Sequence, residues 1–274
     1  MIKEVRGIYF SPSGGTKAIV SSVAESISKE MDEMCLNDIK LEFMDVIKHP
    51  IDENIIFDQE SIIVFGVPVF AGRVPLPCKD IIQRIQGNNA LAVALVSYGN
   101  NTYGDALYEL NGLLENQGFK VVSAGAFISG HSIFNKVAVG RPDKEDLNTM
   151  VKYGRLCANK LKRFATTDIE DLRAKLAPLK IKGSMPTKEP MKMPIRPTVG
   201  KGCLHCGVCA LSCPTGAISM EDTSKVDTSK CVSCTTCIRV CPNNARGFHG
   251  PIVAASSLAF EKLCGKRKDP EWFI

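Results

Sequence analysis

The sequence contains no long apolar segment. Its longest apolar runs, residues 62–70 and 90–96, are far shorter than the 18 or more apolar residues that a membrane-spanning helix needs. Residues 1–6 carry charges and lead into a strand-like run instead of the apolar leader of a secreted protein, so we expect a cytoplasmic protein without a membrane span. With 45% hydrophobic and 23% charged residues, the composition excludes a disordered or collagen-like chain and predicts one or two globular domains.

The charges and the cysteines are unevenly distributed. Residues 1–175 contain 20 Lys and Arg against 22 Asp and Glu, a net charge of −2, whereas residues 176–274 contain 14 against 7, a net charge of +7. Eight of the 12 cysteines lie between Cys203 and Cys241, within this basic part, and a reducing cytosol favours metal or cluster ligands over disulfides. Two four-thiolate iron-sulfur clusters would each add about two negative charges and offset most of the excess. We therefore expect no nucleic-acid partner.

Strand-like and helix-like patterns alternate along the first 175 residues. The predicted strands are residues 5–10, 41–46, 62–67, 91–96 and 121–128. The predicted helices are one that follows the first strand, with an apolar residue at every fourth position from Ile19 to Met31, and residues 76–85, 103–116 and 142–164. This order predicts an α/β fold with an open, doubly wound sheet of five parallel strands. Residues 47–60 show little helical periodicity, which predicts an irregular crossover.

Five of the 15 prolines lie between Pro178 and Pro197. Such a segment cannot be helical throughout, and it is either an extended linker or a strap that lies on the surface. Beyond the clustered cysteines, residues 252–264 are predicted to form a helix, and the apolar C-terminus is expected to dock on the protein. The four isolated cysteines, Cys35, Cys78, Cys157 and Cys264, are interpreted as small apolar residues.

The strongest signal is a motif, C-x2-C-x2-C-x3-C-P, that occurs twice with a shift of 28 residues. Its cysteines are Cys203, Cys206, Cys209 and Cys213 in the first copy, and Cys231, Cys234, Cys237 and Cys241 in the second. This is the ligand spacing of bacterial two-cluster ferredoxins. A tetrahedral zinc site uses thiolates in pairs and has no use for the third cysteine or the proline. The motif therefore predicts two 4Fe-4S clusters.

In such paired motifs the fourth cysteine of each copy binds the other cluster. We therefore assign Cys203, Cys206, Cys209 and Cys241 to the first cluster, and Cys213, Cys231, Cys234 and Cys237 to the second. A segment of about 50 residues buries too little apolar surface to fold unaided, so the clusters are expected to form its core. His205 is interpreted as a spacer residue, because four thiolates per cluster are already supplied.

Three loops point to a ligand of the first domain. Residues 11–16 (Ser-Pro-Ser-Gly-Gly-Thr) join the first strand to a helix, where backbone amides and the hydroxyls of Ser11, Ser13 and Thr16 can bind a phosphate. An ordinary capped helix start is the alternative, since the loop matches neither GxxxxGK[ST] nor GxGxxG. Residues 66–75 and 97–105 follow the third and fourth strands, at the edge where doubly wound sheets bind ligands.

The second and third loops contain residues suited to a planar ring. Phe70, Tyr98 and Tyr103 can flank such a ring, and Gly72 and Gly99 let the backbone approach it. The loop after the fifth strand contains His131, which either touches the edge of the ring or caps its own loop.

The three loops, both cysteine motifs and the C-terminal Pro-Glu-Trp-Phe together resemble the flavodoxin-ferredoxin fusion proteins of anaerobic microbes. The resemblance implies an FMN-binding, flavodoxin-like domain in residues 1–175, a Pro-rich linker in 176–200, a small α+β domain with two 4Fe-4S clusters in 201–250, and a C-terminal helix and tail in 251–274. The residues implied to bind FMN are Ser11, Ser13, Gly14, Gly15, Thr16, Pro68, Val69, Phe70, Ala71, Gly72, Arg73, Tyr98, Gly99, Asn100, Asn101, Tyr103 and Asp105.

The predicted function is that of an iron-sulfur flavoprotein that passes electrons between two 4Fe-4S clusters and FMN, with redox proteins as its electron donors or acceptors. One alternative is an FMN-dependent reductase of a small molecule, although no acid-base or nucleophile constellation in the sequence identifies a substrate. A second alternative is a ferredoxin whose first domain binds no flavin and serves only for docking.

Overall fold

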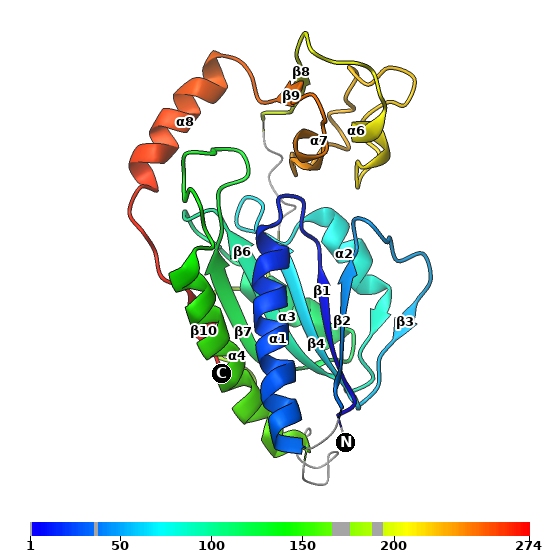
Figure 1. Ribbon diagram of the computed structural model, residues 1–274, viewed down its shortest axis with the longest axis vertical. Coiled ribbons are helices and arrows are strands. Elements are labelled where there is room, and N and C mark those ends of the chain that lie inside the picture. Colours follow the sequence, from blue (N-terminus) through cyan, green and yellow to red (C-terminus); the bar gives the residue numbers. More distant parts are fainter. Residues whose placement is uncertain (1, 36–37, 166–175, 188–193) are drawn as a thin grey trace.

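The computed structural model describes residues 2–35, 38–165, 176–187 and 194–274 and contains a central six-stranded sheet (Figure 1). The five predicted strands are β1 (Glu4–Tyr9), β2 (Lys40–Asp45), β4 (Ser61–Pro68), β6 (Leu91–Tyr98) and β7 (Lys120–Ile128). They are parallel and lie in the order β7-β6-β4-β1-β2. This is the flavodoxin-like strand order, which confirms the predicted fold class. The sixth strand, β10 (Glu271–Phe273), comes from the C-terminal tail and pairs antiparallel with β7.

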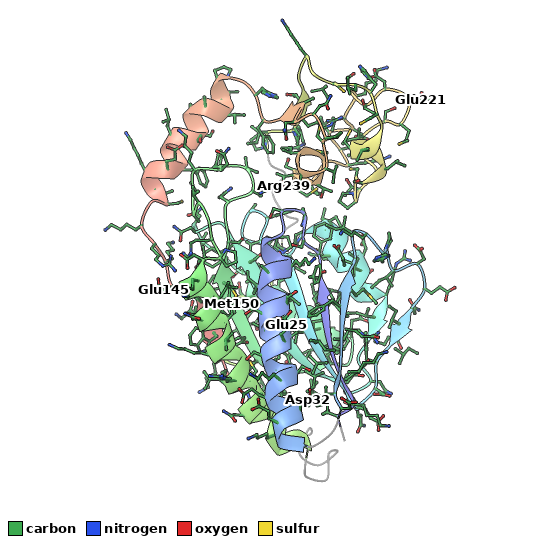
Figure 2. The ribbon with its side chains drawn as sticks, viewed as in Figure 1. Glu25, Asp32, Glu145, Met150, Glu221 and Arg239 are labelled. Atoms are coloured by element: carbon green, nitrogen blue, oxygen red, sulfur yellow. The ribbon has the colours of Figure 1, made fainter. Side chains whose placement is uncertain are left out.

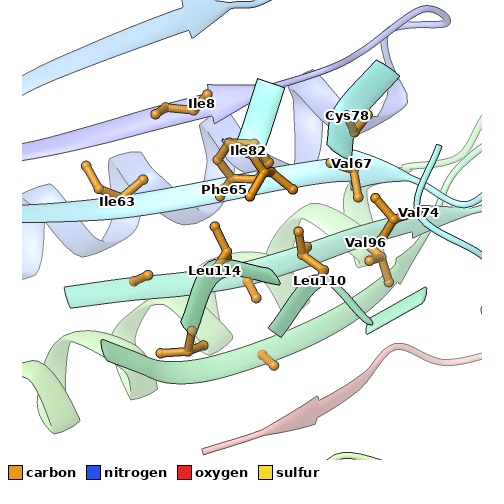
Figure 3. Packing of buried hydrophobic residues seen from close by; sticks show 14 of the residues in the cluster. Ile8, Ile63, Phe65, Val67, Val74, Cys78, Ile82, Val96, Leu110 and Leu114 are labelled. Carbon is orange, nitrogen blue, oxygen red and sulfur yellow. The ribbon is translucent and has the colours of Figure 1, made fainter. Parts of the chain in front are cut away.

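Two pairs of helices cover the two faces of the sheet. On one face, α1 (Gly15–Cys35) and α4 (Lys144–Ala165) pack on the strands through buried residues such as Val23 and Met150. On the other face, α2 (Leu76–Gln83) and α3 (Ala106–Asn116) contribute Ile82 and Leu110 to a second core (Figure 3). Every residue of β4 and β6 is buried, as expected of central parallel strands covered on both sides.

In α1 and α4, side chains that face the sheet are buried and side chains on the opposite side are exposed. Met150 of α4 is fully buried, whereas Glu25 of α1 is exposed (Figure 2). Helix α4 begins at Lys144 and not at the predicted Pro142, because the Asp143 side chain accepts hydrogen bonds from the amides of Glu145 and Asp146 at 3.0 Å and so caps the helix. No helix in the described ranges is long and apolar enough to cross a membrane.

The connection between β2 and β4 contains no helix in its described residues. It includes the short strand β3 (Ile55–Ile56), which pairs with β5 (Ile85–Gln86) beside the main sheet. The predicted irregular crossover is therefore present.

Residues 198–247, here called the cysteine module, lie beyond the carboxyl ends of the parallel strands (Figure 1). The module contains the one-turn helices α6 (Val208–Leu211) and α7 (Thr236–Arg239) and the two-stranded sheet of β8 (Thr198–Val199) and β9 (Arg246–Gly247). Its buried apolar residues are few: Cys209, Ala210, Ala217, Ile218, Cys237 and Ala245. So small a core agrees with the expectation that bound clusters complete it.

The internal duplication extends to the backbone. Gly207 and Thr235, which lie 28 residues apart, have φ angles of 77° and 73° and precede α6 and α7. His205 and Ser233 form a second such pair, with φ angles of 52° and 53°. Both copies thus use the same left-handed turns, although glycine occupies only one of these four positions.

Two segments that flank the cysteine module in sequence connect it to the sheet domain. Within residues 176–187, Leu179 and Ile181 pack on the core that contains α2 and α3, so this part of the Pro-rich segment is a strap. Residues 188–193 of that segment lie outside the described residues. After the cysteine module, α8 (Pro251–Leu263) leads back along the molecule to β10 (Figure 1).

Candidate functional site

The eight clustered cysteines surround two separate cavities. Cys203, Cys206, Cys209 and Cys241 line the first cavity, and Cys213, Cys231, Cys234 and Cys237 line the second. The fourth cysteine of each motif thus lies with the first three of the other motif. The structure brings the cysteines together in the crossed sets that the sequence predicted, and ligation itself remains a prediction.

The chemistry of both cavities suits a 4Fe-4S cluster. Each offers four thiols, one for each iron of a cubane. The amide of Ala217 donates to Cys213 Sγ at 3.3 Å, and the amide of Ala245 donates to Cys241 Sγ at 3.2 Å. Such amide-to-sulfur bonds stabilise thiolate charge and tune cluster potential. Among the described residues, no three Cys, His, Asp or Glu side chains converge closely enough for a single metal ion.

A third cavity lies at the carboxyl ends of β1, β4, β6 and β7. Its lining comes from four loops of the sheet domain, namely Pro12 and Ser13, residues 68–70, residues 97–99 and residues 129–132. Of the residues implied to bind FMN, this lining includes Ser13, Pro68, Val69, Phe70, Tyr98 and Gly99. We call it the flavin pocket, after the resemblance that implies FMN binding at these loops. Cys234 of the second cysteine set also lines it, so the flavin pocket adjoins the second cluster cavity.

In the loop of residues 11–16, two of the hydroxyls predicted to bind a phosphate instead bond to other groups of the protein. The amide of Lys17 donates to Ser11 Oγ at 2.9 Å, which caps the start of α1. Thr16 Oγ1 is 2.7 Å from Ser97 Oγ, and both residues are buried. Gly14 has a φ of +89°, which turns the loop into the helix. The amino end of α1 and Ser13 therefore remain the predicted anion-binding elements beside the pocket.

The predicted FMN ligands omitted the loop of residues 129–132. Within it, His131 Nδ1 accepts hydrogen bonds from the amides of Ile133 and Phe134 at 3.2 Å each. Burial lowers the pKa of His131 to about 4, so the ring is neutral at pH 7 with its proton on Nε2. A Cβ at Gly99 would lie 2.6 Å from this ring, so the two loops pack closely. The sequence feature that could have identified this loop as part of the pocket is its position directly after the fifth predicted strand.

Residues 70–73 form a tight turn, and its two end residues, Phe70 and Arg73, have different contacts although both were predicted to bind FMN. Phe70 and Arg73 are paired, and Ala71 and Gly72 between them have φ angles of 50° and 78°. Arg73 Nε and Nη2 donate to Glu109 of α3 at 2.9 and 2.8 Å. Arg73 thus fixes the turn to α3, while Phe70 faces the pocket.

Several predicted ligands in residues 98–105 instead hold other parts of the chain. The buried side chain of Asn100 donates to the carbonyls of Cys264 and Lys266 at 2.6 and 2.8 Å. Tyr103 donates to Glu271 of β10, and burial together with that bond raises the pKa of Tyr103 above its usual value. The Asn101 carbonyl accepts a bond from Lys268, and Asp105 accepts one from the amide of Ser184 at 3.1 Å. This loop therefore anchors both the tail and the strap.

The cysteine module matches a known domain family. Residues 202–245 match the 4Fe-4S dicluster domain. A stretch of 45 residues is 40% identical to one component of the ion-translocating oxidoreductase complex of Methanosarcina acetivorans. That match covers 16% of this chain and only 17% of the length of the relative.

Solved structures with similar folds align with the rest of the chain. A flavodoxin from the domain Archaea is 18% identical with a TM-score of 0.40, and the alignment covers 58% of this chain and 99% of that one. A flavone reductase is 12% identical with a TM-score of 0.43, covering 61% and 66%. The fold assignment itself comes from the strand order of this chain. The chain thus joins a flavodoxin-like sheet domain to a 4Fe-4S dicluster module.

Proposed function

We propose that this protein is an electron carrier that binds two 4Fe-4S clusters and one FMN. The observation that supports this most directly is the position of Cys234, which lines both the second cluster cavity and the flavin pocket. When bound, the clusters supply single-electron carriers and the flavin supplies a carrier for one or two electrons. Because Cys234 belongs to the lining of both cavities, the second cluster and the flavin would lie close to each other.

The residues of this chain have distinct tasks in the proposed site. The two cysteine sets hold the clusters, and Ser13 with the amino end of α1 holds the FMN phosphate. Phe70 and Tyr98 flank the ring and limit its contact with water. Neutral His131 offers an Nε2 proton as a hydrogen-bond donor within the same pocket.

The first cysteine set is the more accessible side of the module. Cys206 is exposed, and the neighbouring side chains of Leu204 and Leu211 are 72% and 76% exposed. The second set lies against the sheet domain through Cys234. We therefore propose that redox partner proteins approach the first set in the cytoplasm, and that electrons travel between this surface and the flavin pocket through the second set.

We expect about eight irons, eight acid-labile sulfides and one FMN per chain, because eight thiols form two sets of four and there is one flavin pocket. The measurement is iron, sulfide and flavin analysis of protein purified without oxygen. Zinc without iron would contradict the cluster assignment. Full iron without flavin would leave the protein a ferredoxin with a flavin-free docking domain.

A second candidate function, an FMN-dependent reductase of a small molecule, is favoured by a cavity between the domains. This cavity measures about 370 Å³ and is lined by Phe70, Pro75 and Leu76 on one side and by Pro214, Cys231 and Val232 on the other. Its size and largely apolar walls are those of a small-molecule site. It shares Phe70 with the flavin pocket and Cys231 with the second cluster cavity, so a bound acceptor would lie beside both.

Duroquinone, a quinone with no free ring position for thiol addition, is a suitable probe of this cavity. If the reductase function is correct, we expect saturable binding at about one site per oxidised holoprotein in equilibrium dialysis. Leu76→Trp should weaken it at least tenfold by filling the cavity, whereas the control Leu211→Trp, at an exposed position outside the lining, should not. Equal binding by both variants, or none by the unaltered protein, would remove this candidate.

A further inference from the structure

Arg246 is a buried cation at the boundary between the two cysteine cavities. It is the first residue of β9, and only 4% of it is exposed. Among the described residues, it is the one that lines both the cavity of the first cysteine set and the cavity of the second. A charge at this place acts on both cavities at short range.

The guanidinium group of Arg246 lacks partners for most of its donors. Nη2 donates to the Thr223 carbonyl, but Nε and Nη1 are buried without a hydrogen-bond partner. No carboxylate in the described part of the chain forms an ion pair with it. Burial of a charge without an ionic partner is unfavourable, so the arrangement favours an anion that comes with the cavities themselves.

The internal repeat shows that this arginine breaks the symmetry of the duplication. Arg246 lies five positions after Cys241, and the equivalent position after Cys213 is Ile218. Ile218 is buried, lines only the second cavity and belongs to the apolar core of the module. An apolar residue therefore fills this position in one copy, and a buried cation fills it in the other.

We propose that Arg246 is a counter-ion shared by the two clusters and sets the reduction potentials of both. The inference rests on the proposed binding of two clusters in these cavities. Each four-thiolate cluster carries about two negative charges, and its reduction adds one electron and one more negative charge. A fixed cation between the cavities stabilises the reduced form of each cluster more than its oxidised form, which raises both potentials. The free Nε and Nη1 protons add hydrogen-bond donors toward cluster sulfur.

The test is a redox titration of oxygen-free holoprotein followed by electron paramagnetic resonance, with iron counted in each sample. Arg246→Gln should make both clusters at least tenfold harder to reduce, a shift of about 59 mV for each one-electron step. Arg246→Lys keeps the charge and should restore most of that shift. Arg239→Gln removes one positive charge from an exposed position of α7 and should change neither potential appreciably (Figure 2).

Unchanged potentials in Arg246→Gln with full iron content would overturn the proposal, because a purely structural arginine would give that result. A shift in only one cluster would also contradict a shared counter-ion. If Arg246→Gln does not assemble clusters, the charge requirement is judged from Arg246→Lys, which must assemble both clusters for the proposal to stand. Absence of iron from the unaltered protein would instead be a failure of the proposed function.

Discussion

Cys213→Ser is expected to remove or perturb the cluster of Cys231, Cys234 and Cys237, although Cys213 belongs to the other motif by sequence. The four thiols of this set line one cavity, and the cavity of Cys203 is separate from it. The x3 spacing and the following proline carry the fourth cysteine away from its own motif. About half of the iron should be lost or altered, and the damage should be confined to one cluster.

Electron paramagnetic resonance of the reduced protein can distinguish the two clusters, because their surroundings differ. Leu204 and His205 in the first motif correspond to Val232 and Ser233 in the second. Cys213→Ser and Cys231→Ser should affect the same signal, and Cys203→Ser and Cys241→Ser should affect the other one. Cys78→Ala, a buried thiol that lines neither cysteine cavity, is the control and should leave both signals intact. If Cys213→Ser affects the same signal as Cys203→Ser, each motif binds its own cluster and the crossed assignment is wrong.

The sheet domain could be predicted because its local signals agree with its tertiary structure. Central parallel strands are buried on both faces, so β4 and β6 are continuous apolar runs in the sequence. The cysteine sets were predictable for a similar reason, since the exact repeat of spacing constrains which thiols can meet. In both cases the information lies within a short window of residues.

The features that sequence reasoning missed depend on contacts between distant segments. Asn100 follows a strand in the way a flavin ligand would, but its partners are carbonyls of residues 264 and 266. Likewise, β10 is only three residues long and has no periodicity of its own, because β7 supplies its hydrogen bonds. Arg246 is different, because the sequence alone could have drawn attention to it: in an alignment of the two copies of the cysteine motif, it stands where the other copy has Ile218.

The C-terminal tail packs directly on the sheet domain. Trp272 stacks on Phe127 at 6.4 Å between ring centroids and lies 5.7 Å from Tyr153, and the Phe273 carbonyl accepts a bond from Ser123 at 2.8 Å. The chain enters the cysteine module from the strap and returns from it to the sheet edge. Both ends of the module are therefore tied to the domain that contains the flavin pocket.

Trp272→Ala is expected to lower the free energy of unfolding of the sheet domain by about 3 kcal/mol, because it removes a large ring that packs on the core through Phe127 and Tyr153. We also expect weaker FMN binding, since β10 holds Tyr103 through Glu271, and Tyr103 in turn packs edge-on against Tyr98 of the flavin pocket at 5.7 Å. Urea unfolding and flavin titration measure the two effects.

Ile274→Ala is the matched control for this variant, because Ile274 is the neighbouring apolar residue beyond β10 and is 45% exposed. It should change the free energy of unfolding by less than about 1 kcal/mol and leave FMN affinity as it is. A Trp272→Ala protein with unaltered stability would show that the tail contributes little to the sheet. A destabilised protein that still binds FMN normally would show that the 98–105 loop keeps its conformation without β10, and the proposed link from the tail to the flavin pocket would be wrong.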